Sequence, residues 1–84
     1  MNAKEVAGTR AAEYAQNGMV VGLGTGSTAE FAIRALGRRV AEGLQITAVS
    51  TSIASTQLAK SLDMRVATLE AQTVVDLTID GADE

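Results

Sequence analysis

The chain has 84 residues, a formal net charge of −3 at pH 7 and a hydrophobic fraction of 46%, which fits one small folded domain. It contains no Cys and no His, which excludes disulfides and thiolate sites and removes the usual general base and the commonest zinc ligand. The acidic charge and the scarcity of aromatic residues argue against nucleic-acid binding, and no apolar run is long enough to span a bilayer. The start of the chain lacks the features of a signal peptide, so we expect a cytoplasmic or plastid-stromal protein.

The first third of the chain predicts a helix followed by a short strand. The helix covers residues 2 to about 16, with Asn2 as its cap and Glu5 three residues later in the capping-box position. Asn17-Gly18 ends it, because Gly tolerates the left-handed conformation common at helix ends. The apolar run at residues 19–23 contains two adjacent valines without alternation, which is typical of a strand buried on both faces.

The rest of the chain continues this alternation of helices and strands. We expect a helix over residues 27 to about 42, a strand over 44–50, a helix over 52–62, and strands over 64–69 and 74–79. The apolar face of the longest helix is formed by Ala29, Ile33, Leu36 and Val40. Strands that alternate with helices of ten or more residues predict a parallel sheet of right-handed crossover units. Residues 1–84 are therefore expected to form one α/β domain, or part of one, with a Rossmann-like parallel sheet and flanking helices.

Three glycines, Gly22, Gly24 and Gly26, lie where the first strand leads into the second helix. Glycine permits positive φ and lets the backbone approach a ligand closely, and a helix start attracts anions. The hydroxyl groups that a ligand would meet here are those of Thr25, Ser27 and Thr28. This pattern predicts a phosphate-binding turn. The alternatives are that Ser27 caps the helix, with Glu30 three residues later, or that the segment is a tight turn without a ligand.

Two better-known phosphate motifs do not match this turn. The dinucleotide pattern G-x-G-x-x-G requires Gly at position 27, where the chain has Ser27. The P-loop pattern requires a Lys in the turn, and none is present. The turn therefore matches neither motif, and the expected ligand is a phosphate or another anion.

Two carboxylates, Asp80 and Asp83, follow the last predicted strand, at the edge where open α/β sheets bind ligands. Gly81 and Ala82 between them allow the chain to turn sharply without bulk. Carboxylates near a phosphate can act as base, acid or anchor for a hydroxyl group. The alternatives are a solvated acidic loop, or a cap formed by Asp80 on the next element.

A metal site is a weaker alternative at this end of the chain. Its ligands would be drawn from Asp76, Asp80, Asp83 and Glu84. Their spacing does not match a calcium-binding loop, and magnesium usually takes only one or two such ligands together with substrate phosphate. We therefore expect no protein-held metal.

The remaining polar residues carry weaker signals. Lys4 and Lys60 lie on predicted helices and are expected to be solvated. Ser52 is expected to cap the third helix. The alternative for this region is a polar pocket wall formed by residues 51–52 and 55–56.

Four strings occur in order over residues 20–84: VGLGTGSTA, LGRRV-x-x-GL, VSTS and DLTIDGADE. Together they resemble the amino-terminal part of the A-type ribose-5-phosphate isomerases. The resemblance implies a cofactor-free enzyme of the pentose phosphate pathway that interconverts ribose 5-phosphate and ribulose 5-phosphate through an enediol. It also implies that the full-length enzyme is a homodimer or homotetramer.

The resemblance assigns two substrate-binding loops. The first is formed by Thr25, Gly26, Ser27 and Thr28, and the second by Asp80, Gly81, Ala82 and Asp83. In the second loop, the family pattern implies that Asp83 positions or relays the proton, and that Asp80 contacts sugar hydroxyls or assists ring opening. Both aspartates are thus the expected catalytic residues within these 84 residues.

The family places its general base, a Glu, and a Lys-Gly-Gly-Gly loop after the DGADE segment, and neither is present in this sequence. An enediol route needs a positioned base and a positive group for the developing oxyanion. We therefore expect the 84 residues alone to be inactive or nearly so. A non-catalytic sugar-phosphate sensor domain is one alternative, although no helix-turn-helix accompanies it, and a truncated chain without a stable fold is another.

Overall fold

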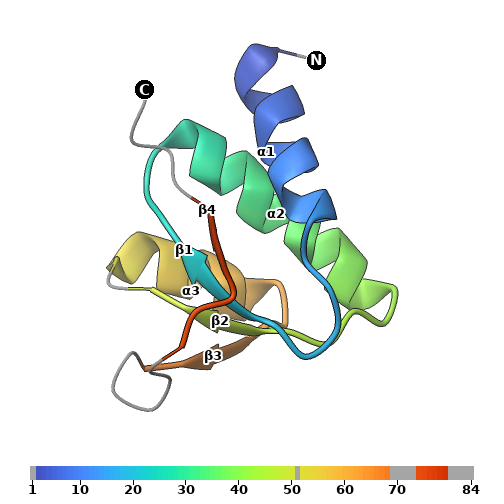
Figure 1. Ribbon diagram of the computed structural model, residues 1–84. Helices are drawn as coiled ribbons and strands as arrows, with labels where there is room; N and C mark the ends of the chain where they lie inside the picture. Colours follow the sequence, from blue (N-terminus) through green and yellow to red (C-terminus); the bar gives the residue numbers. More distant parts are fainter. Residues whose placement is uncertain (1, 51, 69–73, 80–84) are drawn as a thin grey trace.

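The computed structural model describes residues 2–50, 52–68 and 74–79. Within them the elements in chain order are α1 (Ala3–Glu13), β1 (Val20–Leu23), α2 (Ser27–Ala41), β2 (Thr47–Val49), α3 (Ile53–Ser61), β3 (Arg65–Ala67) and β4 (Leu77–Ile79) (Figure 1). Every predicted helix and strand is present, so the predicted order is confirmed. The boundaries are tighter than predicted, most clearly for α1, which ends at Glu13 instead of near residue 16.

The strands form one sheet in the order β3-β2-β1-β4, and every neighbouring pair is parallel. This arrangement confirms the predicted α/β fold with a parallel sheet. The chain adds β2 and β3 on one side of β1 and then returns to place β4 on the other side. The change of direction between β1 and β4 is a topological switch point, and in open α/β sheets the ligand crevice lies there, at the carboxyl ends of the strands.

The hydrophobic core lies between the sheet and the helices. Its largest fully buried side chains are Ile33 and Leu36 of α2, Val21 of β1 and Val49 of β2. Burial alternates along β1, with Val21 and Leu23 buried and the intervening residues only half-buried. The prediction that β1 is buried on both faces is therefore wrong for the described residues, because one face of this strand packs more closely than the other.

Two helix caps agree with the sequence. The side chain of Asn2 accepts a hydrogen bond from the backbone N–H of Glu5 at 2.8 Å, and the hydroxyl of Ser52 accepts one from the N–H of Ser55 at 3.3 Å. Both caps satisfy amide groups that the first turn of a helix leaves without internal acceptors. In the part of the chain that the structure describes, no helix has the length and apolarity required to cross a membrane.

Candidate functional site

The glycine turn lies at the switch point of the sheet, directly after β1. Its backbone is tied to β4, because the N–H of Gly24 donates to the carbonyl oxygen of Ile79 at 2.6 Å. Gly26 has φ 96° and ψ 170°, a combination that is essentially confined to glycine. The turn therefore depends on Gly26 for its backbone path into α2.

Helix α2 begins at Ser27, and its N-cap is Gly26, which makes no side-chain hydrogen bond to the helix. The alternative in which Ser27 caps the helix is therefore wrong, since Ser27 already occupies the first helical position. A helix start presents amide N–H groups and the positive end of the helix dipole toward the switch point. Thr25 and Gly26 are exposed, and Ser27 and Thr28 are half-buried. This geometry suits a phosphate group.

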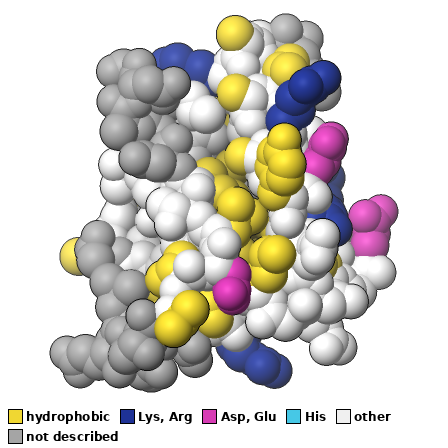
Figure 2. Space-filling model, viewed as in Figure 1, with side chains coloured by type: hydrophobic (Ala, Val, Ile, Leu, Met, Phe, Trp, Pro, Cys, Tyr) yellow, Lys and Arg dark blue, Asp and Glu magenta, His cyan; other side chains and the backbone are white. Residues whose placement is uncertain are grey.

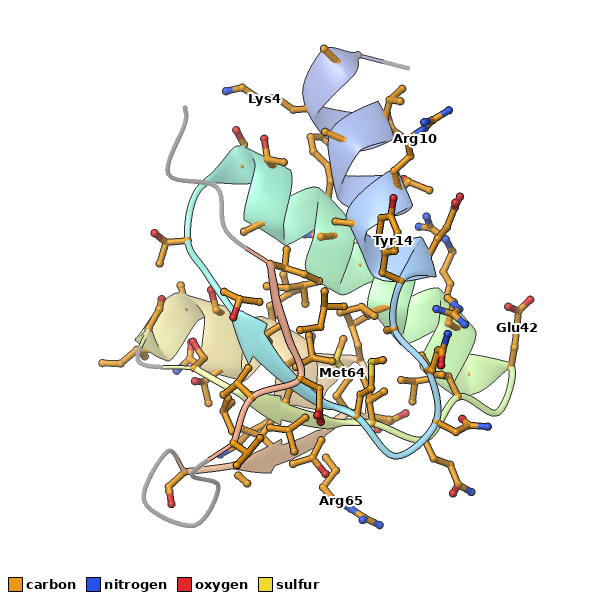
Figure 3. The ribbon with its side chains drawn as sticks, viewed as in Figure 1. Lys4, Arg10, Tyr14, Glu42, Met64 and Arg65 are labelled. Carbon is orange, nitrogen blue, oxygen red and sulfur yellow. The ribbon has the colours of Figure 1, made fainter. Side chains whose placement is uncertain are left out.

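Lys4 lies at the same end of the molecule. Its Nζ donates a hydrogen bond to the Oγ of Ser27 at 2.9 Å, and Figure 3 shows the side chain leaving α1 on the side of the first turn of α2. Lys4 is exposed to solvent as predicted, but the prediction did not include its hydrogen bond to Ser27. Sequence reasoning missed this neighbour because the two residues are 23 positions apart. A usable signal was the four-residue spacing of Lys4, Gly8 and Ala12, which puts them on one face of α1.

A cavity of about 390 Å³ opens beside the glycine turn, between α2 and α3. It is lined by Thr25, Gly26, Glu30, Ile33, Arg34, Ser52, Ala54, Ser55 and Leu58. The buried Ser55 donates from its Oγ to the carbonyl oxygen of Gly24 at 2.8 Å and so fixes α3 against the turn. Ser52 and Ser55 thus form part of a polar wall, as the alternative for this region predicted, whereas Thr56 does not line the cavity. Thr51 lies outside the described residues.

The second predicted loop, with Asp80, Gly81, Ala82, Asp83 and the neighbouring Glu84, lies outside the described residues. The residue before it, Ile79, is described and pairs with Leu23 at the end of β1. The chain therefore leaves β4 beside the glycine turn. The described end of β4 and the end of β1 thus lie side by side at one edge of the sheet.

Asp76 does not share that edge. Its carboxylate accepts a hydrogen bond from the N–H of Val20 at 2.8 Å, and its own N–H donates to the Val20 carbonyl, also at 2.8 Å. These contacts fix Asp76 beside the amino end of β4, which begins at Leu77. Among the described residues, no group of three or more His, Cys, Asp or Glu side chains is arranged to hold a metal ion.

Comparisons with known proteins agree with this fold. The sequence model of a family described as ribose 5-phosphate isomerase A (phosphoriboisomerase A) matches residues 47–84. Ribose-5-phosphate isomerase A of Streptococcus pneumoniae serotype 19F (strain G54) is 51% identical over 84 residues, which cover 99% of this chain and 37% of that protein.

Solved structures give the same result. The structure of ribose 5-phosphate isomerase A from Methanocaldococcus jannaschii superposes with a TM-score of 0.89 at 40% identity, over 96% of this chain and 36% of that one. A D-ribose-5-phosphate isomerase in complex with phospho-erythronic acid superposes with a TM-score of 0.91 at 37% identity. The match covers 100% of this chain and 39% of that one. The chain thus spans a little over one third of the relatives it matches. The sequence identity and the shared fold together show that this chain belongs to the ribose-5-phosphate isomerase A family.

Proposed function

We propose that this chain supplies the phosphate- and sugar-binding loops of an isomerase that interconverts ribose 5-phosphate and ribulose 5-phosphate. The observation that carries the proposal is the position of the glycine turn at the switch point, tied through Gly24 to the last residue of β4. Support also comes from a related isomerase, which was solved with phospho-erythronic acid, a phosphorylated sugar acid. The proposal extends to a cytoplasmic homodimer or homotetramer, which rests on the family resemblance and which sedimentation velocity would test.

In this proposal the ligand's phosphate binds at the start of α2. The amide groups of the first helical turn, the hydroxyl groups of Thr25, Ser27 and Thr28, and the ammonium of Lys4 surround it. Each of these groups can donate a hydrogen bond to a phosphate oxygen. The sugar then extends along the switch point toward the loop that follows Ile79.

Asp80 and Asp83 are proposed to act at the reacting end of the sugar. Asp80 contacts the hydroxyl groups or assists opening of the furanose ring, and Asp83 positions or relays a proton. The isomerisation removes a proton from C2 of the open aldose and returns one to C1, so the enediol forms and collapses without any net gain or loss of atoms. The base that takes the C2 proton and the group that stabilises the oxyanion belong, on the family pattern, to residues beyond these 84.

This assignment predicts phosphate-dependent binding without turnover by the 84 residues alone. We expect ribose 5-phosphate to bind and ribose to bind at least tenfold more weakly, because phosphate contacts to charged and amide donors carry most of the affinity. Calorimetric titration would measure both affinities, and circular dichroism would first establish that the chain is folded. A coupled assay for ribulose 5-phosphate, made on protein cleared of host isomerase, should show no activity above background.

Each other result of these measurements has a definite meaning. Equal affinity for ribose and ribose 5-phosphate would contradict a phosphate site at the glycine turn. Turnover that survives removal of host enzyme would show that Asp80, Asp83 and their neighbours suffice for catalysis. If the full-length protein that contains these 84 residues bound ribose 5-phosphate tightly but did not convert it, that result would favour the sensor alternative over the isomerase.

Replacing Lys4 with Ala is expected to weaken ribose 5-phosphate binding by about tenfold, because one charge-assisted hydrogen bond to phosphate is lost. The matched control is Lys60→Ala. Lys60 is also an exposed helical lysine, but it lies in the last turn of α3, while Lys4 lies in the first turn of α1 beside Ser27. Both variants change the net charge equally, so a nonspecific charge effect would appear in both.

The two lysine variants are compared by titration at two salt concentrations. Loss of affinity in Lys4→Ala, with Lys60→Ala within twofold of the unchanged protein, supports the assignment of Lys4 to the phosphate site. A similar loss in both variants, or none in either, would remove Lys4 from that site.

A further inference from the structure

Helix α1 lies against α2 (Figure 1), and the two helices make contacts at three levels, from the first turn of α1 to its carboxyl end. At the first level, Lys4 donates to Ser27. At the middle level lies Gly8, which is buried against α2. At the last level, Arg39 of α2 binds the carboxyl end of α1. These contacts run along both helices in the same direction, so the position of α1 on α2 determines where Lys4 lies.

Gly8 allows the two helix backbones to touch. A Cβ atom added at Gly8 would lie 2.7 Å from the backbone nitrogen of Ala32, 2.7 Å from the carbonyl oxygen of Thr28 and 2.8 Å from the Cβ of Phe31. Ordinary contacts between heavy atoms are about 3.5–4.0 Å. Because two of the three opposing atoms belong to the backbone of α2, a side chain at position 8 would force the helices apart by roughly an ångström.

The glycine is costly in itself, since Gly within a helix is about 1 kcal/mol less favourable than Ala. The close approach it permits lies within the first two turns of α2, where Thr28 directly follows Ser27. Lys4 lies one helical turn before Gly8, four residues earlier and on the same face of α1. A change at Gly8 would therefore be transmitted directly to the separation of Lys4 and Ser27.

Arg39 holds the other end of α1. Its Nη1 donates to the carbonyl oxygens of Ala12 and Ala15, each at 2.7 Å. The last carbonyl groups of a helix have no internal donors, and a cation there also interacts favourably with the helix dipole. Ala12 and Ala15 are fully buried, so no larger side chain separates this end of α1 from α2.

We propose that Gly8 and Arg39 are positioning residues that hold α1 at the separation from α2 which places the Lys4 ammonium in the phosphate site. This inference rests on the proposed function, in which the Lys4 ammonium beside Ser27 binds the phosphate of the ligand. Neither residue touches the ligand. Substitutions of these residues change the affinity for the ligand only by displacing Lys4. They should therefore have no effect on affinity when Lys4 is absent, whereas a general role in folding would not depend on Lys4.

The test is a double-mutant cycle on the intact protein, with ribose 5-phosphate affinity measured by calorimetry. We expect Gly8→Ala to weaken binding by five- to tenfold when Lys4 is present and by less than twofold in the Lys4→Ala background. Arg39→Met is carried through the same cycle, with an expected loss of two- to fivefold that also disappears without Lys4. If Gly8→Ala does not fold, the Arg39→Met variant still tests whether the loss of affinity depends on Lys4.

The matched control for the glycine is Gly37→Ala. Gly37 is also a buried helical glycine, and a Cβ there would lie 2.8 Å from Cδ1 and 2.9 Å from Cβ of Leu62, at the contact between α2 and α3. This variant disturbs helix packing without displacing α1. It should lower the melting temperature while leaving the affinity within twofold of the unchanged protein.

The outcomes separate the inference from the proposed function. Losses in Gly8→Ala or Arg39→Met that persist at full size in the Lys4→Ala background would overturn the positioning role and leave the phosphate site intact. A loss of affinity in Gly37→Ala equal to that in Gly8→Ala would overturn it too. No effect of Lys4→Ala, or no binding by the unchanged protein, would overturn both.

Discussion

Replacing Gly26 with Ala is expected to weaken ribose 5-phosphate binding by roughly ten- to a hundredfold, the largest loss expected from one substitution among the described residues of the site. Gly26 has φ 96° and ψ 170°, and a residue with a Cβ atom is strained there by about 1–3 kcal/mol. Relief of that strain would rotate the peptide group that leads into α2. The amide groups of the first helical turn would then no longer converge on the phosphate.

Gly43→Ala provides the control for the strain. Gly43 follows α2 with φ 113°, and a Cβ at this position would meet no atom within 4 Å. Both substitutions carry a backbone penalty, but Gly43 lies at the opposite end of α2 from Gly26. Urea denaturation would compare their stabilities, and calorimetric titration would compare their affinities. Equal binding losses in the two variants would mean that Gly26 has no special role in the site.

Ile33→Ala is expected to lower the free energy of unfolding by about 2–5 kcal/mol. Ile33 is 1% exposed and packs in the core between α2 and the sheet. Removal of three carbon atoms loses their burial and leaves a cavity that the neighbours fill only in part. A domain of this size has a total stability of roughly 4–13 kcal/mol, so the variant is expected to be close to unfolding at 37 °C.

The matched control is Ile53→Ala, which makes the same chemical change at the surface. Ile53 is the first residue of α3 and is 78% exposed, and exposed substitutions usually change stability by less than about 0.5 kcal/mol. Chemical denaturation followed by circular dichroism measures both variants. A loss for Ile53→Ala as large as that for Ile33→Ala would contradict the assignment of the core.

The local features of the chain were predictable because they depend on neighbours in sequence. The cap at Asn2, the cap at Ser52 and the apolar face of α2 are all confirmed. The glycine turn was predicted as a strand-to-helix connection suited to phosphate, and it occupies that place. The sequence left open whether Ser27 caps α2, and the structure assigns the cap to Gly26.

The contacts around Lys4 could not be predicted in this way. Helix α1 carries little amphipathic pattern, because the face that it buries consists of glycine and alanine, with Gly8 and Ala12 as its buried residues. Without large apolar residues to mark that face, the sequence did not indicate against which element α1 packs. Lys4 was therefore expected in solvent.

Asp76 shows a similar limit. By sequence it lies four residues from Asp80 and belongs to the same acidic run. In the structure, the carboxylate of Asp76 accepts a hydrogen bond from the N–H of Val20 before β4 begins. Val20 is 56 positions away in the sequence, so this contact of Asp76 could not be predicted from its neighbours.

By itself, the sequence determined the class of fold, the order of the elements, the glycine turn between β1 and α2, and the family, because hydrophobic periodicity, glycine placement and capping act over a few residues. The tertiary structure decided which strands are neighbours, that β4 returns to the far side of β1, and that α1 lies on α2 with Lys4 beside Ser27. Those features depend on the packing of surfaces that are distant in the chain, and the small side chains that permit the closest packing leave the weakest pattern in the sequence.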